Sequence, residues 1–323
     1  MEVFDSLDGA QDWVLRLLLA NGARTRTRGL DTLELFPVSF AIRHPRRRCV
    51  TSPTRRWNLP LALGEFSWHV SGSNELRFVS YYSKRWREFA EDGSTIWGSC
   101  YGHRIFKRSG GQPSQWEKLI TLLKIEPQSR RAVLSLLDAD HGLSPSSKDV
   151  ACACTLQFLV RSGQLVAVVY MRSNDVIWGL PYDVFLFSML QELLARELDL
   201  DLGPYFHFAG SLHLYERHFE LAQQVIDSQP LLSFEMPQME TPGQLTRFLR
   251  HENRLRAGET VSAESLQDVD RYWRDLLIVL DWYRQAKDAG SYQSVASKIQ
   301  SDSPYQFLLQ NMVKTVQRVG AKA

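Results

Sequence analysis

The sequence predicts an α+β fold in which helices and strands are mixed along one chain. Apolar residues recur with helical spacing in several segments, and between them other runs alternate apolar and polar residues as strands do. With 323 residues, of which 44% are hydrophobic and 23% charged, the chain can bury a large core. These three observations indicate a globular protein of mixed secondary structure.

The first part of the chain is expected to form a helix and then to enter a sheet. Helical periodicity over residues 1–20 ends at Gly22, and the alternating run TLELFPVSFAI, residues 32–42, is typical of a strand. Helical spacing returns in LPLALGEFSWHVSG, residues 59–72, where Glu65 lies within an otherwise apolar pattern. A carboxylate in such surroundings is unfavourable unless it has a partner or a function.

The middle of the chain is expected to supply most of the sheet. An aromatic, glycine-rich loop is expected over residues 86–101, a helix over 113–127 and a strand over 129–138. Two alternating runs, CTLQFLVRSG and QLVAVVYMRSN, meet at a Ser-Gly pair that is typical of a hairpin turn. A helix over 183–198 and a strand over 205–215 complete the expected core.

The composition changes near Gln229, after which prolines and charged residues become more frequent. Helical patterns return in residues 268–287. We therefore expect a core over residues 1–229 and a helical segment, residues 230–323, packed on it. The sequence shows no internal repeat.

Charge and cysteine content restrict the function classes. The net charge of +2 is too small for a chain that binds polyanions with its whole surface. The apolar segment over residues 13–20 contains Arg16 and is too short to span a bilayer, so no membrane association is expected. Four cysteines without a secretion signal fit a reducing compartment, and we expect the cytoplasm. Cys152 and Cys154 are too close in sequence, and lack neighbouring Cys or His partners, for a zinc site, so no metal is expected.

Six landmarks stand in a fixed order between Trp13 and His218. They are GEFSW at residues 64–68, Trp86 with Tyr101-Gly102, EPQSRR at 126–131, Cys152 five positions before Gln157-Phe158, RSNDVIWGLPYD at 172–183, and GSLHLYERH at 210–218. Together they resemble the thymidylate synthase superfamily. The resemblance implies a large mixed sheet flanked by helices, with the sheets of two subunits packed back to back in a homodimer.

The resemblance also implies the chemistry. It makes Cys152 the nucleophile that adds to C6 of a pyrimidine, with Cys154 a packed neighbour, and 5,10-methylenetetrahydrofolate the co-substrate that gives a carbon to C5. Nearby arginines are expected to lower the pKa of Cys152, because they favour the thiolate. Glu65 is expected to relay protons; the alternative is a buried ion pair with an arginine.

The remaining site residues follow from the same resemblance. Arg172 and Ser173 are expected to hold the substrate phosphate, together with Arg130 and Arg131 from the second subunit. Arg28 is expected to join them from a mobile loop, with Arg24 and Arg26 as competitors. His213 and Tyr215 are expected to bind the sugar hydroxyls, Gln157 to contact the substrate, and the folate to lie against Trp86, Tyr101, Asp175 and Gly179.

Three departures from thymidylate synthases point to the cytidylate hydroxymethylase branch of the superfamily. Asp183 replaces the asparagine that reads uracil, and it is expected to accept from N4 of cytosine. Ala153 replaces a histidine near O4. The sequence end VQRVGAKA lacks the short apolar tail that seals the folate pocket, which favours attack by water. The expected product is therefore a 5-hydroxymethylcytosine nucleotide, with release of tetrahydrofolate.

Several alternatives remain open. A cytidylate C5-methylase would use the same residues but would take a hydride from the folate. A nucleic-acid-binding protein on this fold would use the basic segment over residues 43–56, although that segment lacks interleaved aromatic residues. The substrate is CMP, which would indicate nucleoside-antibiotic synthesis, or dCMP, which would indicate modified-DNA precursors.

Overall fold

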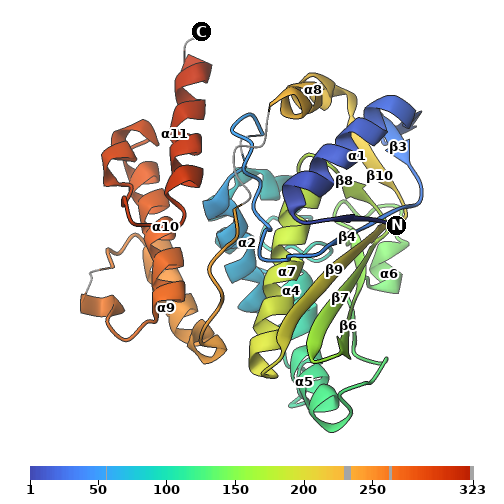
Figure 1. The fold of residues 1–323 in the computed structure, drawn as a ribbon, viewed down its shortest axis with the longest axis horizontal. Coiled ribbons are helices and arrows are strands. Elements are labelled where there is room, and N and C mark those ends of the chain that lie inside the picture. Colours follow the sequence, from blue (N-terminus) through green and yellow to red (C-terminus); the bar gives the residue numbers. More distant parts are fainter. Residues whose placement is uncertain (56, 229–233, 262–263, 321–323) are drawn as a thin grey trace.

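The computed structural model describes residues 1–55, 57–228, 234–261 and 264–320. It confirms the expected mixture of helices and strands, with a large mixed sheet and helices stacked against it (Figure 1). This sheet has six strands in the order β1-β4-β9-β7-β6-β5, with both parallel and antiparallel neighbours. The strands are β1 (Glu2–Phe4), β4 (Val38–Ile42), β9 (Asp201–Ala209), β7 (Gln164–Met171), β6 (Ala153–Arg161) and β5 (Val133–Ser135).

A second sheet has four strands in the order β2-β3-β10-β8. Its strands are β2 (Ala23–Thr27), β3 (Leu30–Leu35), β10 (Leu212–Tyr215) and β8 (Asn174–Asp175). Because β8 follows β7 and β10 follows β9 along the chain, this small sheet continues from the ends of two central strands of the large one.

The chain passes between the two sheets twice, and both crossings correct an expectation. The single strand expected over residues 32–42 is wrong, since β3 and β4 lie in different sheets and Pro37, which has no N–H, stands between them. The single strand expected over 205–215 is wrong as well, because β9 ends before Gly210 and β10 begins after it. A Cβ on Gly210 would lie 3.1 Å from the Tyr170 hydroxyl oxygen, so the crossing brings the backbone close to β7.

The expected hairpin is confirmed as β6 and β7, joined at Ser162 and Gly163 with φ values of 50° and 76°. Its ladder is irregular between Ala153 and Thr155, where β6 carries an extra residue, Cys154. The irregularity lies at the end of β6 that is nearest in sequence to Cys152.

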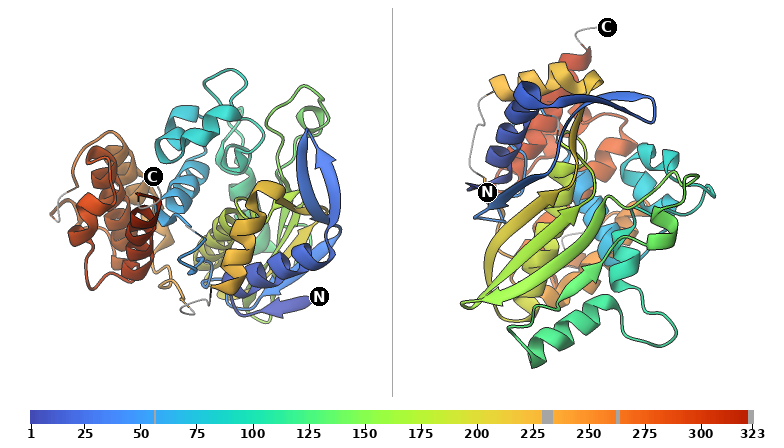
Figure 2. Two further views of the ribbon diagram at one scale, coloured as in Figure 1. Left: turned by 90° about the horizontal axis from the view of Figure 1, so that it is seen from above. Right: turned by 90° about the vertical axis from the view of Figure 1, so that its right-hand side faces the viewer.

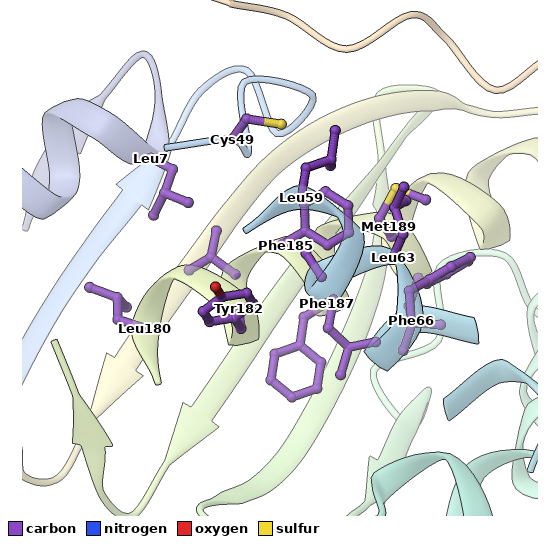
Figure 3. Close-up of a cluster of buried hydrophobic side chains, with 14 of the residues drawn as sticks. Leu7, Cys49, Leu59, Leu63, Phe66, Leu180, Tyr182, Phe185, Phe187 and Met189 are labelled. Carbon is purple, nitrogen blue, oxygen red and sulfur yellow. The ribbon is translucent and has the colours of Figure 1, made fainter. Parts of the chain in front are cut away.

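Two helices form the centre of the core. Helix α7 (Leu180–Glu197) lies on β7 and β9 and is buried over most of its length. Helix α2 (Leu59–Val70) packs against α7 and is capped by Asn58, whose side chain accepts from the Leu61 amide at 2.9 Å. Figure 3 shows side chains from both helices gathered in one cluster, among them Leu59, Leu63 and Phe66 of α2 and Tyr182, Phe185 and Phe187 of α7.

Further helices lie around this centre, and they include those expected over residues 1–20 and 113–127. They are α1 (Leu7–Asn21), α3 (Leu76–Tyr82), α4 (Tyr101–Phe106), α5 (Gln115–Ile125), α6 (Ala139–Gly142) and α8 (Phe219–Asp227), with the 3-10 helices η1 (Lys84–Glu88) and η2 (Glu216–His218).

The last part of the chain is helical, as expected. It contains α9 (Leu245–Arg256), α10 (Arg271–Asp288) and α11 (Gln306–Gly320), with η3 (Pro242–Gln244), η4 (Glu264–Leu266) and η5 (Gln293–Lys298). These helices lie on the side of α2 that faces away from the large sheet (Figures 1 and 2). The expected boundary near residue 229 lies outside the described residues, because residues 229–233 are not described. The same holds for residues 321–323, the last three of the segment VQRVGAKA.

Buried polar contacts join the C-terminal helices to the core. The Tyr82 hydroxyl of α3 donates to Glu252 of α9 at 2.7 Å, and the Tyr283 hydroxyl of α10 donates to the Tyr82 carbonyl at 3.0 Å. Among the described residues, no helix combines the length and the apolar content needed to cross a bilayer. All four cysteines are free.

Candidate active site

Cys152 is held just before the first residue of β6. Its carbonyl accepts from the Arg172 amide at 2.8 Å, and the next residue, Ala153, donates its amide to the Tyr101 hydroxyl at 3.3 Å. The guanidinium of Arg172 donates to the carbonyls of Ala151 at 2.8 Å and of Val150 at 3.1 Å. The segment that carries the thiol is therefore fixed on both sides, by β7 and by α4.

The thiol is protonated at neutral pH. Burial raises the pKa of Cys152 to about 11; Arg172 acts to lower this pKa, whereas Asp183 and Asp149 raise it further. Arg172 therefore acts to lower the pKa of Cys152, as expected, but burial raises this pKa by more. Burial also raises the pKa of Cys154. Forming the reactive thiolate thus requires a proton acceptor or a change in the surroundings of Cys152.

Glu65 projects from the middle of α2 and accepts a hydrogen bond of 3.0 Å from the Trp86 indole nitrogen. Burial raises the pKa of Glu65 to about 8; the bond from Trp86 lowers it, and the charge of Asp183 raises it. Its hydrogen-bond partner is thus an indole and not the arginine of the alternative interpretation. At neutral pH the carboxyl is largely protonated and can donate a proton.

Asp183 lies in the first turn of α7, and its Oδ2 accepts a hydrogen bond of 2.8 Å from Asn174 Nδ2. Burial raises the pKa of Asp183 to about 7; the bond from Asn174 lowers it, and Asp175 raises it. Asp183 influences the pKa of Glu65 and that of Cys152, so the three expected catalytic groups, each half-buried, share one region. Such a cluster of perturbed groups is typical of an active site.

Three further polar residues, Asn174, His207 and Tyr205, stand behind Asp183, and sequence reasoning missed them. Asn174 Oδ1 lies 3.1 Å from His207 Nε2, and His207 Nδ1 lies 3.1 Å from the Tyr205 hydroxyl. All three side chains are buried, and burial lowers the pKa of His207 to about 3. The signal in the sequence is that Tyr205 and His207 occupy the inward positions of a strand whose other inward residues are apolar.

The expected sugar-binding pair lies next to this region. His213 and Tyr215 project from β10 with their rings edge to face, 5.1 Å apart. His213 stands opposite Asp175 of β8, while the charge of Cys152 acts on the pKa of Tyr215. The half-buried Ser173 immediately precedes β8 in the chain. The structure thus brings these residues together with the cluster around Cys152.

The four expected folate contacts differ in character. Trp86 is engaged with Glu65, and Asp175 Oδ1 accepts from the amides of Ile177 at 2.7 Å and Trp178 at 3.2 Å. Tyr101 is buried, and its ring stacks on that of His69 at 5.4 Å, so it braces the start of β6.

The fourth expected folate contact, Gly179, stands at the beginning of α7. A Cβ there would lie 2.9 Å from Asn174 Nδ2, so a side chain at this position would displace the amide that binds Asp183.

The structure does not bring four expected substrate contacts into the cluster. Arg130 and Arg131 are exposed before β5; Arg131 binds Glu126, and the Arg130 carbonyl accepts from Gln157 Nε2 at 2.9 Å. Arg28 is exposed at the turn between β2 and β3 with a positive φ of 51°.

The competitors of Arg28 are engaged in exposed ion pairs. Arg24 lies 3.7 Å from Glu216, and Arg26 lies 3.8 Å from Asp31. Exposed pairs of this kind are weak, so they do not exclude either arginine from binding a ligand.

Another arginine, Arg55, is buried near the cluster, although it was not among the site residues expected from the sequence. It donates to the Ile177 carbonyl, and its guanidinium carbon lies 4.8 Å above the Trp178 ring. Its Nε and Nη1 have no hydrogen-bond partner among the described residues. Two free donors on a buried cation fit an anionic ligand group. Nothing in the sequence distinguishes Arg55 from the other arginines of the basic segment.

Three other arginines of the basic segment are bound within the chain. Arg46 and Arg47 share the carboxylate of Glu235, and Arg48 forms a buried pair with Glu192. These contacts argue against a nucleic-acid interface on this segment, because the three guanidinium groups already face carboxylates of the chain itself. No group of three or more potential metal ligands is found within the described ranges.

Comparison with known proteins agrees with this geometry. Residues 12–252 match the sequence profile of the family described as thymidylate synthase, so the match runs past residue 229 into α9. The chain is 33% identical over 208 residues to the deoxyuridylate hydroxymethyltransferase of Pseudomonas phage M6. The aligned residues cover 64% of this chain and 58% of the phage protein. The chain is 27% identical over 191 residues to the thymidylate synthase of Francisella philomiragia, covering 55% of this chain and 69% of that one.

Proposed function

The chain belongs to the thymidylate synthase family, and from this premise we propose that it converts a cytidine nucleotide, CMP or dCMP, to its 5-hydroxymethyl derivative. The observation that carries the choice of base is the buried carboxyl of Asp183 where uracil-reading members of the family have an amide. The relative from phage M6, a hydroxymethyltransferase by name, supports the hydroxymethyl product. The four free cysteines fit the cytoplasm as the place of action.

In the proposed reaction, Cys152 forms a bond from its sulfur to C6 of the pyrimidine, which places an electron pair at C5. Arg172 favours the thiolate needed for this step, since it lowers the pKa of Cys152 against the effect of burial. Glu65, protonated at neutral pH, donates a proton as the bond from the folate nitrogen to the transferred carbon breaks, and it receives the proton that C5 loses on bonding to that carbon. The sulfur then leaves C6 as the thiolate.

The residues present also fit a folate co-substrate. 5,10-Methylenetetrahydrofolate would supply the carbon that becomes the hydroxymethyl group, and a water molecule would supply its oxygen without a change in the oxidation state of the folate. Trp86, Asp175 and Gly179 would hold it near Glu65. The N–H groups on Nε and Nη1 of Arg55, which lack partners among the described residues, would donate to one of its carboxylates.

A uridylate hydroxymethyltransferase is the second candidate. The phage M6 relative carries deoxyuridylate in its name, and the pKa of Asp183, about 7, leaves much of this carboxyl neutral at physiological pH. A neutral carboxyl has one donor and one acceptor, as an amide has, so it can match O4 and N3–H of uracil. Only the ionised form of Asp183 is therefore fully expected to reject uracil.

The substrate test uses purified protein with 5,10-methylenetetrahydrofolate and, in separate reactions, CMP, dCMP, UMP and dUMP. Mass analysis identifies the product, and absorbance reports any dihydrofolate. We expect a hydroxymethyl product from a cytidine nucleotide with no dihydrofolate. Products from uridine nucleotides alone would support the second candidate, and stoichiometric dihydrofolate would identify a C5-methylase.

The role of Asp183 is tested separately with Asp183→Asn. This change should shift the ratio of kcat/KM for cytidylate over uridylate toward uridylate by about ten- to a hundredfold, because one mismatched buried hydrogen bond is worth about 1–3 kcal/mol. An unchanged ratio would mean that Asp183 does not read the base.

We also propose a homodimer. Tyr170 of β7 and Phe208 of β9 are paired in the large sheet and are both exposed, as is Val133 on β5. Exposed apolar side chains on one sheet are unusual on a monomer and fit a second sheet packed against them. Arg130 and Arg131, which directly precede β5, would then be positioned to reach the partner's site.

A further inference from the structure

A directional hydrogen-bond chain runs from Tyr205 through His207 and Asn174 to Asp183. The three distances along it are 3.1 Å, 3.1 Å and 2.8 Å. It begins on β9, passes through β8 and ends in the first turn of α7. Tyr205 and His207 are fully buried, and Asn174 is 1% exposed.

The direction of the chain follows from the donors and acceptors at each step. An ionised or neutral carboxyl can accept at Oδ2, so Asn174 turns its Nδ2 toward Asp183 and its Oδ1 toward His207. Oδ1 only accepts, so His207 must carry its proton on Nε2. In a neutral imidazole Nδ1 is then an acceptor, and the Tyr205 hydroxyl donates to it. A pKa of about 3 for His207 keeps the ring neutral throughout the physiological range.

Neighbouring residues hold this chain in one arrangement. The His207 ring stacks on Phe40 with ring centroids 5.0 Å apart. The backbone N–H of Asn174 donates to the Ser211 carbonyl at 2.9 Å, which fixes the backbone of β8. Gly179 leaves the space that the Asn174 side chain occupies, because a Cβ there would lie 2.9 Å from Nδ2. Flipping the Asn174 amide would set its Nδ2 donor against the Nε2–H donor of His207 and its Oδ1 against an acceptor oxygen of the ionised Asp183.

We infer that Asn174 and His207 are positioning residues that decide which oxygen of Asp183 accepts and which one can carry a proton. With Oδ2 held as an acceptor by Asn174, a proton on the neutral carboxyl is restricted to Oδ1. Asp183 then presents one fixed order of donor and acceptor to the base. The inference rests on the proposed role of Asp183 as the residue that reads the base.

The consequence is base selectivity from a side chain that would otherwise lack it. A neutral carboxyl whose proton can occupy either oxygen matches cytosine in one arrangement and uracil in the other. Fixing the proton on one oxygen leaves only one of these matches, and the other base then meets unpaired buried groups. Loss of the hydrogen-bond chain should therefore bring the kcat/KM values for cytidylate and uridylate closer together, whichever base the enzyme prefers.

The test measures the ratio of kcat/KM for cytidylate and uridylate in four variants. His207→Leu and Asn174→Leu remove the donors and keep a branched side chain at each position, and each should move the ratio about tenfold toward one, as expected for one hydrogen bond. His207→Gln retains an amide donor near the position of Nε2 and should keep the ratio within about twofold of the wild type. Asp183→Asn is the fourth variant and reports whether Asp183 reads the base.

Outcomes for the two hypotheses are distinguishable. If Asp183→Asn changes the ratio and neither leucine variant does, the inference is wrong while the base-reading role stands. If Asp183→Asn leaves the ratio unchanged, the base-reading role itself is wrong. A variant that unfolds is recognised by its melting temperature, and the milder Tyr205→Phe then takes its place. Tyr205→Phe should also move the ratio toward one, and a ratio equal to that of the wild type would overturn the inference.

Discussion

The indole nitrogen of Trp86 donates a hydrogen bond of 3.0 Å to Oε1 of Glu65. This contact joins η1, which follows α3, to the carboxyl at the middle of α2. Burial raises the pKa of Glu65 to about 8, and the hydrogen bond from Trp86 lowers it in part. A side chain from a different element thus increases the acidity of the expected proton relay.

Trp86→Phe should raise the pKa of Glu65 further, because the variant keeps the burial but loses the donor that stabilises the ionised form. We expect the limb of the pH–kcat profile that belongs to Glu65 to move upward by about one unit, the value of one hydrogen bond. Glu65→Gln identifies this limb by removing it. Trp97→Phe, at an exposed tryptophan, is the matched control and should leave the profile in place. A profile that is the same in both tryptophan variants would contradict this role of Trp86.

Glu65→Gln should also make the protein more stable at high pH relative to the wild type. The folded protein holds the Glu65 proton up to a pKa of about 8, whereas the unfolded chain releases it near 4.5. Between these values the native state binds more protons, so the free energy of unfolding of the wild type falls as pH rises. The amide has no such dependence. Denaturant unfolding at several pH values should show a difference that grows from pH 4.5 to 8 and then becomes constant, with the exposed Glu88→Gln as a flat control.

Cys152→Ala should abolish release of tritium from C5 of the nucleotide, and Cys154→Ala should retain it. The reason is that only Cys152 stands five positions before Gln157, at the place of the family's nucleophile. Release of tritium reports attack at C6 and does not depend on which folate product follows. The opposite pattern, with activity lost only in Cys154→Ala, would refute the assignment.

Subunits that share active sites should complement one another. Inactive Cys152→Ala mixed with inactive Arg131→Ala should recover about a quarter of the wild-type activity, because half of the random dimers would contain one intact site of two. Cys152→Ala mixed with Glu65→Gln is the matched control, since both residues belong to the same subunit's site and no intact site can form. Exchange is followed with differently tagged chains. Exchange without recovery in the first mixture would contradict shared sites.

Much of the fold could be predicted because its signals are local. Helical spacing identified α1, α5 and α7, and the Ser-Gly pair identified the turn between β6 and β7. The two wrong strands show the limit of such signals. Runs such as residues 32–42 and 205–215 alternate without a break, and the decision to cross between sheets depends on contacts with strands far away in sequence.

The candidate site shows a similar division. Glu65, Cys152 and Asp183 could be identified because each departs from an apolar or strand-like pattern or stands at a family spacing. Their pKa values could not, because burial by α2, α7 and the sheet outweighs the neighbouring charges. Asn174 and His207 lie 33 positions apart and meet only through the order of the strands.

The contacts of Tyr82 with Glu252 and Tyr283 have a consequence for the order of events during synthesis. Helices α2 and α3 leave the ribosome early, but the surface that α9 and α10 cover stays unprotected until the end of the chain has emerged. Co-translational folding can therefore complete the hairpin of β6 and β7 before it completes the packing around Glu65. A nascent chain stalled before residue 245 would carry Cys152 on a formed strand and still expose the apolar flank of α2 to chaperones.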